Sequence, residues 1–115
     1  MRLRILGSLL TVMAAVAGWA QLPSTTSVPA AGGDIMITAL GHASVQLERS
    51  GTVVIVDPVT NFADLSKSKP ADLILVTDIH PDHFDPAAIT KLRKPGAPVV
   101  LTPAAMELND STPYA

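Results

Sequence analysis

The centre of the chain alternates between aliphatic and polar segments in an order that few folds can accommodate. Residues 71–77, "ADLILVT", form a continuous aliphatic run, which is typical of a strand covered on both faces. Residues 85–94, "DPAAITKLRK", predict a helix with Asp85 at the N-cap, Pro86 at the first helical position and basic residues near the C-terminal end. Residues 97–102, "APVVLT", predict the next strand. Strand, helix and strand in this order make a βαβ unit with a parallel pair, so the predicted fold class is α/β.

A hairpin is predicted upstream of this unit. Residues 34–41, "DIMITALG", and 43–50, "ASVQLERS", carry alternating or near-alternating apolar positions. "SGT" at 50–52 indicates a tight turn, and "VVIV" at 53–56 indicates a more buried strand. These segments predict antiparallel pairing ahead of the βαβ unit. At the other end, "PAAMEL" at 103–108 predicts the start of another helix.

The first twenty residues have the organisation of an export signal. "MRLR" supplies a basic start, and an apolar stretch follows that is shorter than the roughly 20 residues needed to span a bilayer. We therefore expect residues 1–20 to be a cleaved signal peptide and the protein to be exported, periplasmic or secreted, with no membrane attachment after cleavage. Residues 21–33 are rich in Pro, Ser, Thr and Gly and predict a flexible mature N-terminus.

Charge and composition exclude some partners. Without Arg2 and Arg4, the chain has six basic and ten acidic side chains and a formal charge of −4. Nucleic acid is therefore not an expected partner, because such binding depends on a Lys/Arg surface that neutralises phosphates. The chain has no cysteine, so any metal ion would have to be held by nitrogen and oxygen atoms.

The loop "TDIHPDHFD" contains two of the chain's three histidines together with three aspartates. It follows a predicted strand and precedes a predicted helix, which is the sheet edge where ligands gather in α/β proteins. Asp78 and His80 are two apart in extended chain and can point to the same side, while Asp82 and His83 follow on a tight turn. Imidazole and carboxylate are usual ligands of zinc at catalytic sites. The spacing therefore predicts a metal site.

Simpler roles are open for the same kinds of residue. Asp85 is best explained as the helix N-cap alone. Asp82 could be a solvated loop carboxylate and His83 a polar surface group. His42, in "GHAS", could be a hydrogen-bonded structural histidine at the start of a strand. An EF-hand calcium loop is excluded, because its central glycine and distal glutamate are absent.

The loop also resembles a known signature. "VTDIHPDHFD" is similar to the histidine–aspartate signature of the metallo-β-lactamase fold superfamily, H-x-H-x-D-H after a buried strand. "LGHASVQLERSGTVVIVDP" resembles the first hairpin of the branch that includes the ascorbate-6-phosphate lactonase-like metal-dependent hydrolases. The resemblance covers residues 34–103. It implies an αβ/βα sandwich, of which residues 34–115 would be the truncated N-terminal part, with the hairpin followed by the βαβ unit.

The resemblance implies a role for each residue of the loop. Asp78 and His80 would bind a first metal ion, and Asp82 and His83 would bind a second. Asp82 would also be the catalytic residue that orients the attacking water. The implied cofactor is Zn²⁺, with two ions in the complete domain.

Two further residues would support these ligands, and two features depart from the family pattern. Asp57, at the end of a strand, and His42 would lie behind the ligands and hold them in orientation. Asp78 stands where the family usually has a histidine, and this exchange makes the site more tolerant of Mn²⁺ or Fe²⁺. No histidine follows His83, so the family's later ligands are expected beyond the printed chain.

The function implied is that of a metal-dependent hydrolase. Metal-activated water would attack an ester, lactone, amide or phosphodiester bond of a small molecule, and the chain would be a fragment of the complete enzyme. The alternatives are a truncated, non-catalytic metal-binding domain and a non-functional gene remnant. Further histidines and aspartates in strand-end loops of a longer coding sequence would favour the enzyme.

Overall fold

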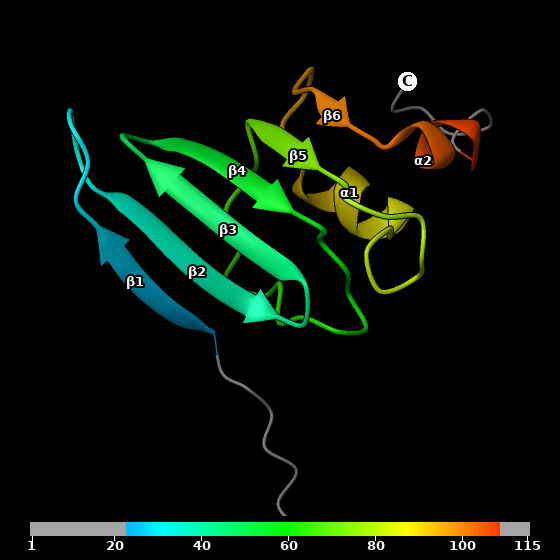
Figure 1. The fold of residues 1–115 in the computed structure, drawn as a ribbon, viewed down its shortest axis with the longest axis horizontal. Helices are drawn as coiled ribbons and strands as arrows, with labels where there is room; N and C mark the ends of the chain where they lie inside the picture. The colour runs from blue at the N-terminus through cyan, green and yellow to red at the C-terminus, as the bar shows by residue number, and fades with distance from the viewer. Residues whose placement is uncertain (1–22, 109–115) are drawn as a thin grey trace, which may run out of the picture.

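The computed structural model describes residues 23–108, and the expected signal peptide at residues 1–20 lies outside them. Six strands form one mixed sheet in the order β1-β2-β3-β4-β5-β6 (Figure 1). The elements are β1 Ser24–Val28, β2 Ile35–Gly41, β3 Ser44–Arg49, β4 Thr52–Val56, β5 Leu73–Leu75, α1 Pro86–Leu92, β6 Val99–Val100 and α2 Pro103–Leu108. None of the helices in this described part is long and apolar enough to cross a bilayer.

Strands β2, β3 and β4 form the antiparallel part of the sheet. β2 pairs with β3 and β3 pairs with β4, so the hairpin predicted from the sequence is confirmed. The β3–β4 turn consists of Ser50 and Gly51, which both have positive φ angles of 49° and 84°. Such turns match the right-handed twist of the flanking strands. The tight turn predicted at "SGT" is therefore also confirmed.

The second part of the sheet is parallel, and α1 connects its last two strands. β4 pairs with β5 and β5 pairs with β6 in parallel, which confirms the predicted βαβ unit. Asp85 caps α1, because its carboxylate accepts hydrogen bonds from the backbone N–H groups of Ala87 and Ala88 at 3.0 and 3.1 Å. The buried core between α1 and the sheet consists of Val53, Ile55, Ala71, Ile74, Val76, Ile89 and Leu92.

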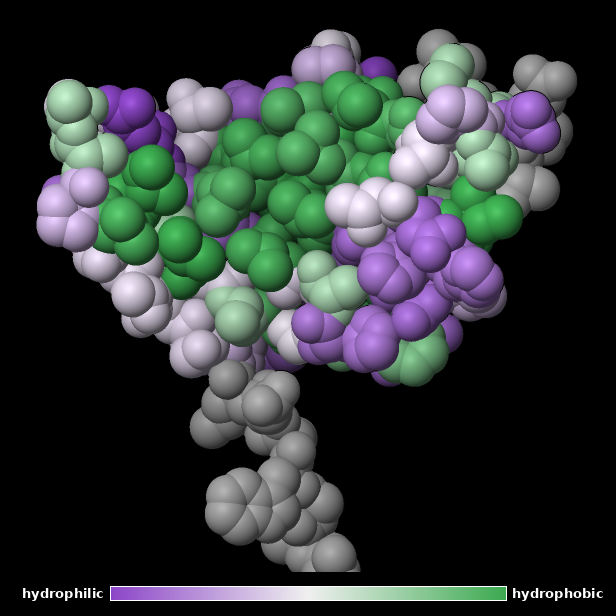
Figure 2. Space-filling model, in the orientation of Figure 1, coloured by the Kyte–Doolittle hydropathy of each residue, from purple (hydrophilic) through white to green (hydrophobic). Residues whose placement is uncertain are grey.

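The two faces of the sheet are covered differently. Ile55 and Ile74 face α1 and are fully buried, whereas Val54 and Leu73 alternate with them and are half-buried on the other face. A broad apolar surface extends over the strands in Figure 2. The sequence predicted that the strand containing Leu73 is covered on both faces. Within residues 23–108 it is fully buried on the α1 side alone.

The structure differs from the sequence expectation at the N-terminal edge of the sheet. Residues 21–33 were expected to be flexible, but residues 24–28 form β1, which pairs antiparallel with β2. All five side chains of β1 are exposed. Backbone hydrogen bonds and the contact of the Thr25 and Thr38 hydroxyls at 2.9 Å hold the strand, so its polar composition does not reveal it.

Candidate metal centre

The topology brings three chain segments to one edge of the sheet. β2 and β4 both run antiparallel to β3, and β5 is parallel to β4, so β2, β4 and β5 end at the same edge (Figure 1). His42 follows β2, Asp57 follows β4, and the loop with Asp82 and His83 follows β5. Side chains that are 40 residues apart in sequence therefore meet here.

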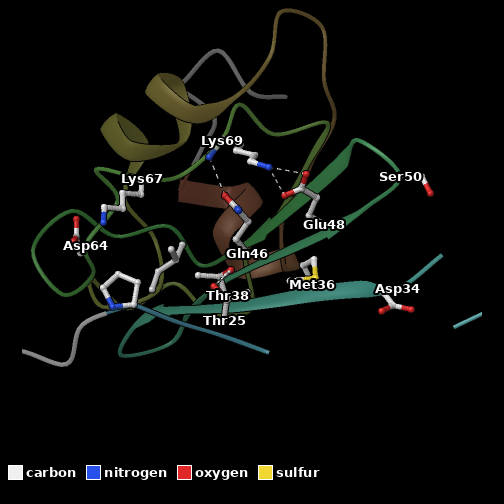
Figure 3. A pocket seen from close by; sticks show the side chains of 12 residues that line it. Thr25, Asp34, Met36, Thr38, Gln46, Glu48, Ser50, Asp64, Lys67 and Lys69 are labelled. Atoms are coloured by element: carbon white, nitrogen blue, oxygen red, sulfur yellow. Dashed lines mark hydrogen bonds and ion pairs between the residues drawn. The ribbon is translucent and has the colours of Figure 1, made fainter. Parts of the chain in front are cut away.

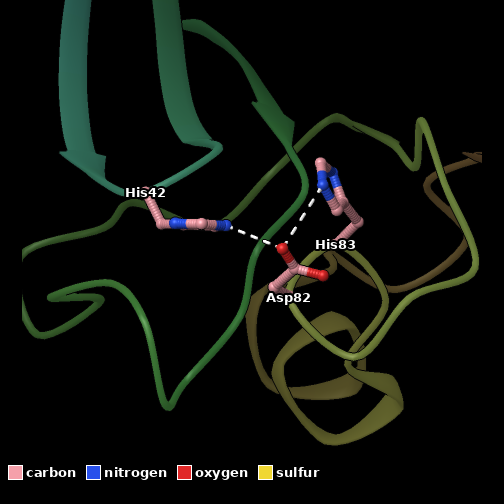
Figure 4. Close-up of side chains that lie close together, drawn as sticks. All are labelled: His42, Asp82 and His83. Atoms are coloured by element: carbon pink, nitrogen blue, oxygen red, sulfur yellow. Dashed lines mark hydrogen bonds and ion pairs between the residues drawn. The ribbon is translucent and has the colours of Figure 1, made fainter.

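His42, Asp82 and His83 form a compact cluster at this edge (Figure 4). Nε2 of His42 lies 2.8 Å from Oδ2 of Asp82, and Nε2 of His83 lies 3.7 Å from the same oxygen. One nitrogen or oxygen atom from each residue lies within 4.8 Å of the other two. The cluster thus offers two imidazole nitrogens and one carboxylate oxygen to a single small volume.

Asp57 fixes the orientation of the His83 ring. Its Oδ2 lies 2.8 Å from Nδ1 of His83, and since a carboxylate accepts only, Nδ1 carries the proton. The Asp57 carboxylate is itself held by Thr77, whose backbone N–H donates to Oδ1 at 2.7 Å and whose hydroxyl donates to Oδ2. Nε2 of His83, the nitrogen that does not contact Asp57, faces Oδ2 of Asp82 at 3.7 Å. Asp57 thus contacts a residue that the resemblance names as a ligand, and its support of a metal ligand stays a prediction.

The charges of the cluster are coupled. The hydrogen bond and negative charge of Asp57 raise the pKa of His83, against the opposing effect of burial. The hydrogen bond from His42 lowers the pKa of Asp82, and the nearby His83 lowers it further. Asp82 is consequently an anionic carboxylate at neutral pH, which is the form that binds a cation or accepts a hydrogen bond from water.

Two residues of the site have an uncommon backbone conformation. His42 and Asp57 have positive φ angles of 49° and 45°. Left-handed non-glycine residues are rare, and strained positions of this kind cluster at functional sites. Gly41 has a φ of 130°, and a Cβ atom built on it would lie 2.9 Å from the carbonyl oxygen of Phe62. The glycine lets the 59–69 loop approach the turn that carries His42.

Asp78 and His80 form a separate pair. Nδ1 of His80 lies 3.0 Å from Oδ1 of Asp78, so the two side chains do point to the same side, as the sequence predicted. The hydrogen bond from His80 lowers the pKa of Asp78. Both side chains are exposed, by 68% for His80 and 45% for Asp78. Among residues 23–108 they are not part of the cluster that His42 forms.

The structure thus arranges the predicted ligands in two groups. Asp82 and His83 lie together, but their third neighbour is His42, which the resemblance placed behind the ligands. Thr77 was not singled out from the sequence. Its position as the first residue of the predicted loop is the sequence signal for it. Whether Asp78 and His80 bind metal stays a prediction.

A concavity lies elsewhere on the molecule. It has a volume of about 740 Å³ and lies on the same face of the sheet as α1, over β1 to β3 (Figure 3). Its polar lining includes Gln46, Glu48 and Lys69, and Nζ of Lys69 bonds to the Glu48 carboxylate at 2.6 and 2.7 Å. The histidines do not line this concavity. The chemistry of the strand-end cluster is therefore not located there.

Comparison with known proteins places the fold in a family. The model of a family described as "Beta-lactamase superfamily domain" matches residues 36–112, which is more than half of the chain. The chain belongs to this family. The matched segment includes the hairpin, the βαβ unit and the whole cluster, so the fold is a partial metallo-β-lactamase-type αβ fold and the resemblance seen in the sequence is confirmed.

Two relatives have names that refer to metal-dependent hydrolysis. A UPF0173 metal-dependent hydrolase of Aeropyrum pernix is 38% identical over 69 residues, which cover 56% of this chain and 28% of that protein. A crystal structure from Parabacteroides distasonis, of a protein provisionally named a metal-dependent hydrolase, has a TM-score of 0.69 and 30% identity. That match covers 75% of this chain and 40% of the other. The chain thus spans less than half the length of either relative.

The side chains of the cluster fit a divalent metal ion. Three protein ligands of the nitrogen and oxygen type, with one position left open, are the usual arrangement of a catalytic zinc site. Metal-binding histidines almost always donate their second ring N–H to a carboxylate or carbonyl group, and His83 donates to Asp57 in this way. The nitrogen and oxygen atoms of the cluster, together with the hydrogen bond from His83 to Asp57, therefore fit the metal ion that the relatives' names imply.

Proposed function

We propose that this protein is a metal-dependent hydrolase that cleaves an ester, lactone, amide or phosphodiester bond of a small molecule. The observation that carries the proposal is the cluster of His42, Asp82 and His83 at the strand ends, with His83 oriented by Asp57. Membership of the family and the names of the two relatives support it. A divalent ion, when bound, supplies a Lewis acid and lowers the pKa of water.

The chain's own residues then have distinct roles. Asp82 is an anion at neutral pH, so its carboxylate can accept a hydrogen bond from the attacking water and orient it. His83 presents Nε2 because Asp57 holds the proton on Nδ1. The positive φ angles of His42 and Asp57 hold the backbone at these two residues in the conformation from which their side chains reach Asp82 and His83 without a bound ligand.

The donor atoms support a choice of ion. Imidazole nitrogen suits zinc and iron, whereas carboxylate oxygen suits harder ions such as manganese. We propose Zn²⁺, with Mn²⁺ or Fe²⁺ as alternatives. A second ion at Asp78 and His80 belongs to the same proposal, since their exposed side chains already point to a common side.

One observation favours a second candidate function. The sheet has a broad apolar face that residues 23–108 leave uncovered (Figure 2). A large exposed apolar surface is typical of a contact site rather than of a free surface. The second candidate is therefore a metal-binding domain that is not catalytic by itself.

Hydrolysis assays with a matched variant pair test the proposal. The full chain is assayed with Zn²⁺, Mn²⁺ and Fe²⁺ on a nitrophenyl ester, a lactone, a nitroanilide and a bis(nitrophenyl) phosphate. We expect one bond class to be cleaved, with activity lost on chelation and reduced about 100-fold or more in Asp82→Asn. Asp34→Asn, an exposed aspartate that bonds to Ser27, is the control. Equal activity in Asp82→Asn would contradict the proposed role of Asp82, and cleavage of none of the four substrates would favour the non-catalytic domain.

We also propose that the protein is exported. The support is the basic start followed by an apolar stretch that ends at Ala20. Intact mass after expression in a secreting host tests this. Loss of residues 1–20 is the expected result, and retention of Met1 in the secreted product would contradict it.

A further inference from the structure

We infer that the first metal ion taken up by this chain is held by His42, Asp82 and His83, with His42 as a direct ligand. This inference deepens the proposed function and rests on it. It departs from the roles implied by the resemblance, where His42 stands behind the ligands and Asp78 and His80 form half of the site.

The distances in the cluster suit direct ligation. Nitrogen and oxygen ligands at about 2.1 Å from a tetrahedral zinc ion lie roughly 3.4 Å from one another. The two separations from Oδ2 of Asp82 are 2.8 Å to His42 and 3.7 Å to His83, on either side of that value. One nitrogen or oxygen atom from each residue already lies within 4.8 Å of the other two. Ligation through Nε2 of His42 displaces the proton that this nitrogen donates to Asp82, either to Nδ1 or to water.

The orientation of both rings points into the same volume. His83 directs Nε2 inward because Nδ1 donates to Asp57. His42 directs Nε2 to the same carboxylate oxygen, and its ring packs against Phe62, with 5.4 Å between the ring centroids. The backbone N–H of Asp64 donates to the carbonyl oxygen of Leu40 at 2.9 Å and ties the 59–69 loop to the strand end from which His42 projects. Two separate contacts therefore hold His42 in a position from which it can bind the ion.

Asp78 and His80 lack such support. Nδ1 of His80 contacts Asp78, and among residues 23–108 no third histidine or carboxylate completes a cluster with this pair. The Asp78 carboxylate also accepts a hydrogen bond from the backbone N–H of Ile79 at 2.6 Å. A site built from these two residues would offer fewer preorganised donors than the cluster does. The first ion is therefore expected at His42, Asp82 and His83.

Nitrogen NMR of the full chain tests the inference without any assay of activity. The chain has three histidines, so each ring can be assigned by one substitution. On addition of one equivalent of Zn²⁺, we expect the Nε2 resonances of His42 and His83 to move to the metal-bound range. The resonances of His80 should change little.

A matched pair of variants completes the test. His42→Gln keeps a hydrogen-bond donor toward Asp82 but supplies a poor ligand, and it is expected to lower Zn²⁺ affinity at least tenfold. His80→Ala should leave the affinity within twofold. His42 is 46% exposed, so its replacement does not disturb the core, and circular dichroism checks the fold.

The outcomes separate this inference from the proposed function. Tight binding in His42→Gln, or metal-bound shifts at His80 in place of His42, would overturn the inference and leave a metal-dependent hydrolase intact. A chain that is folded and binds no Zn²⁺, Mn²⁺ or Fe²⁺ would overturn both.

Discussion

His83 donates its Nδ1 proton to Oδ2 of Asp57 across 2.8 Å, and Asp57 is 2% exposed. A buried carboxylate thus determines which nitrogen of a half-buried imidazole faces the strand-end cluster. Because the two residues follow different strands, the contact also ties the end of β4 to the loop after β5. The pairing is a structural tie, and it orients one ring of the proposed metal site.

Asp57→Asn is expected to lower Zn²⁺ affinity by about 10- to 100-fold, the range found when such supporting carboxylates are removed. An amide is a weaker acceptor than a carboxylate and can present its NH₂ group to His83. Competition with a zinc-binding dye measures the affinity, and Asp34→Asn is the control. Unchanged affinity in Asp57→Asn would show that the contact does not support the site.

Thr77→Val is expected to change the protonation pattern of the His83 ring in the metal-free protein. Valine keeps the shape but removes the hydroxyl that donates to Asp57, so the carboxylate is held less firmly. Nitrogen NMR should show a smaller population with the proton on Nδ1, and Thr77→Ser should restore it. Thr52→Val, an exposed threonine at the start of β4, is the control. The same ring spectrum in Thr77→Val and in the unaltered protein would contradict this role.

Gly41→Ala and Gly51→Ala form a matched pair. Both glycines have positive φ, of 130° at Gly41 and 84° at Gly51, so each substitution adds backbone strain of at least about 1–2 kcal/mol. The added Cβ at residue 41 would also lie 2.9 Å from the Phe62 carbonyl oxygen, whereas at residue 51 nothing lies within 4 Å. Thermal unfolding should show the larger loss for Gly41→Ala, and Zn²⁺ affinity should fall in this variant alone. Equal losses of thermal stability in the two variants would mean that the close approach of the 59–69 loop to Gly41 does not contribute to stability.

Asp72 is expected to make stability depend on pH in the acid range. Its carboxylate accepts hydrogen bonds from Lys94 Nζ at 2.6 Å and from the Val53 backbone N–H at 2.8 Å, and these lower its pKa below the ordinary 3.8. A lowered pKa in the folded state means that the contribution is present above pH 3.8 and is lost as the pH falls through the folded value.

Urea unfolding of Asp72→Asn at several pH values tests this expectation. The variant should be less stable than the unaltered protein at pH 7, and the difference should shrink below the ordinary pKa of 3.8. Asp34→Asn serves again as the control. A difference that is the same at neutral and acid pH would rule out ionisation as its cause.

Much of the fold could be predicted because local signals agreed with one another. Asp85 and Pro86 begin α1 as their residue types predict, and the turn at Gly51 separates two strands of clear apolar pattern. β1 could not be predicted, since its exposed polar side chains carry no apolar period and its order depends on pairing with β2. Pairing at a sheet edge is a non-local interaction that composition does not encode.

The cluster was predictable in part for a related reason. Asp82 and His83 are adjacent in sequence, so their spacing already indicated a ligand pair. His42 joins them from 40 residues away, because β2 and β5 end at the same edge of the sheet. Thr77 acts through Asp57, and a threonine before a polar loop has no distinguishing pattern of its own. Such partners become visible only when the register of the strands is known.

The most direct test of a metal centre at these strand ends is the amount of Zn²⁺ that the folded chain retains after equilibrium dialysis, measured by elemental analysis. At a Zn²⁺ concentration that fills the first site alone, we expect one ion per chain. We also expect loss of that ion in a double variant, Asp82→Ala with His83→Ala, and retention in His80→Ala. A folded chain that retains no ion, or a double variant that retains the same amount as the unaltered chain, would contradict this expectation.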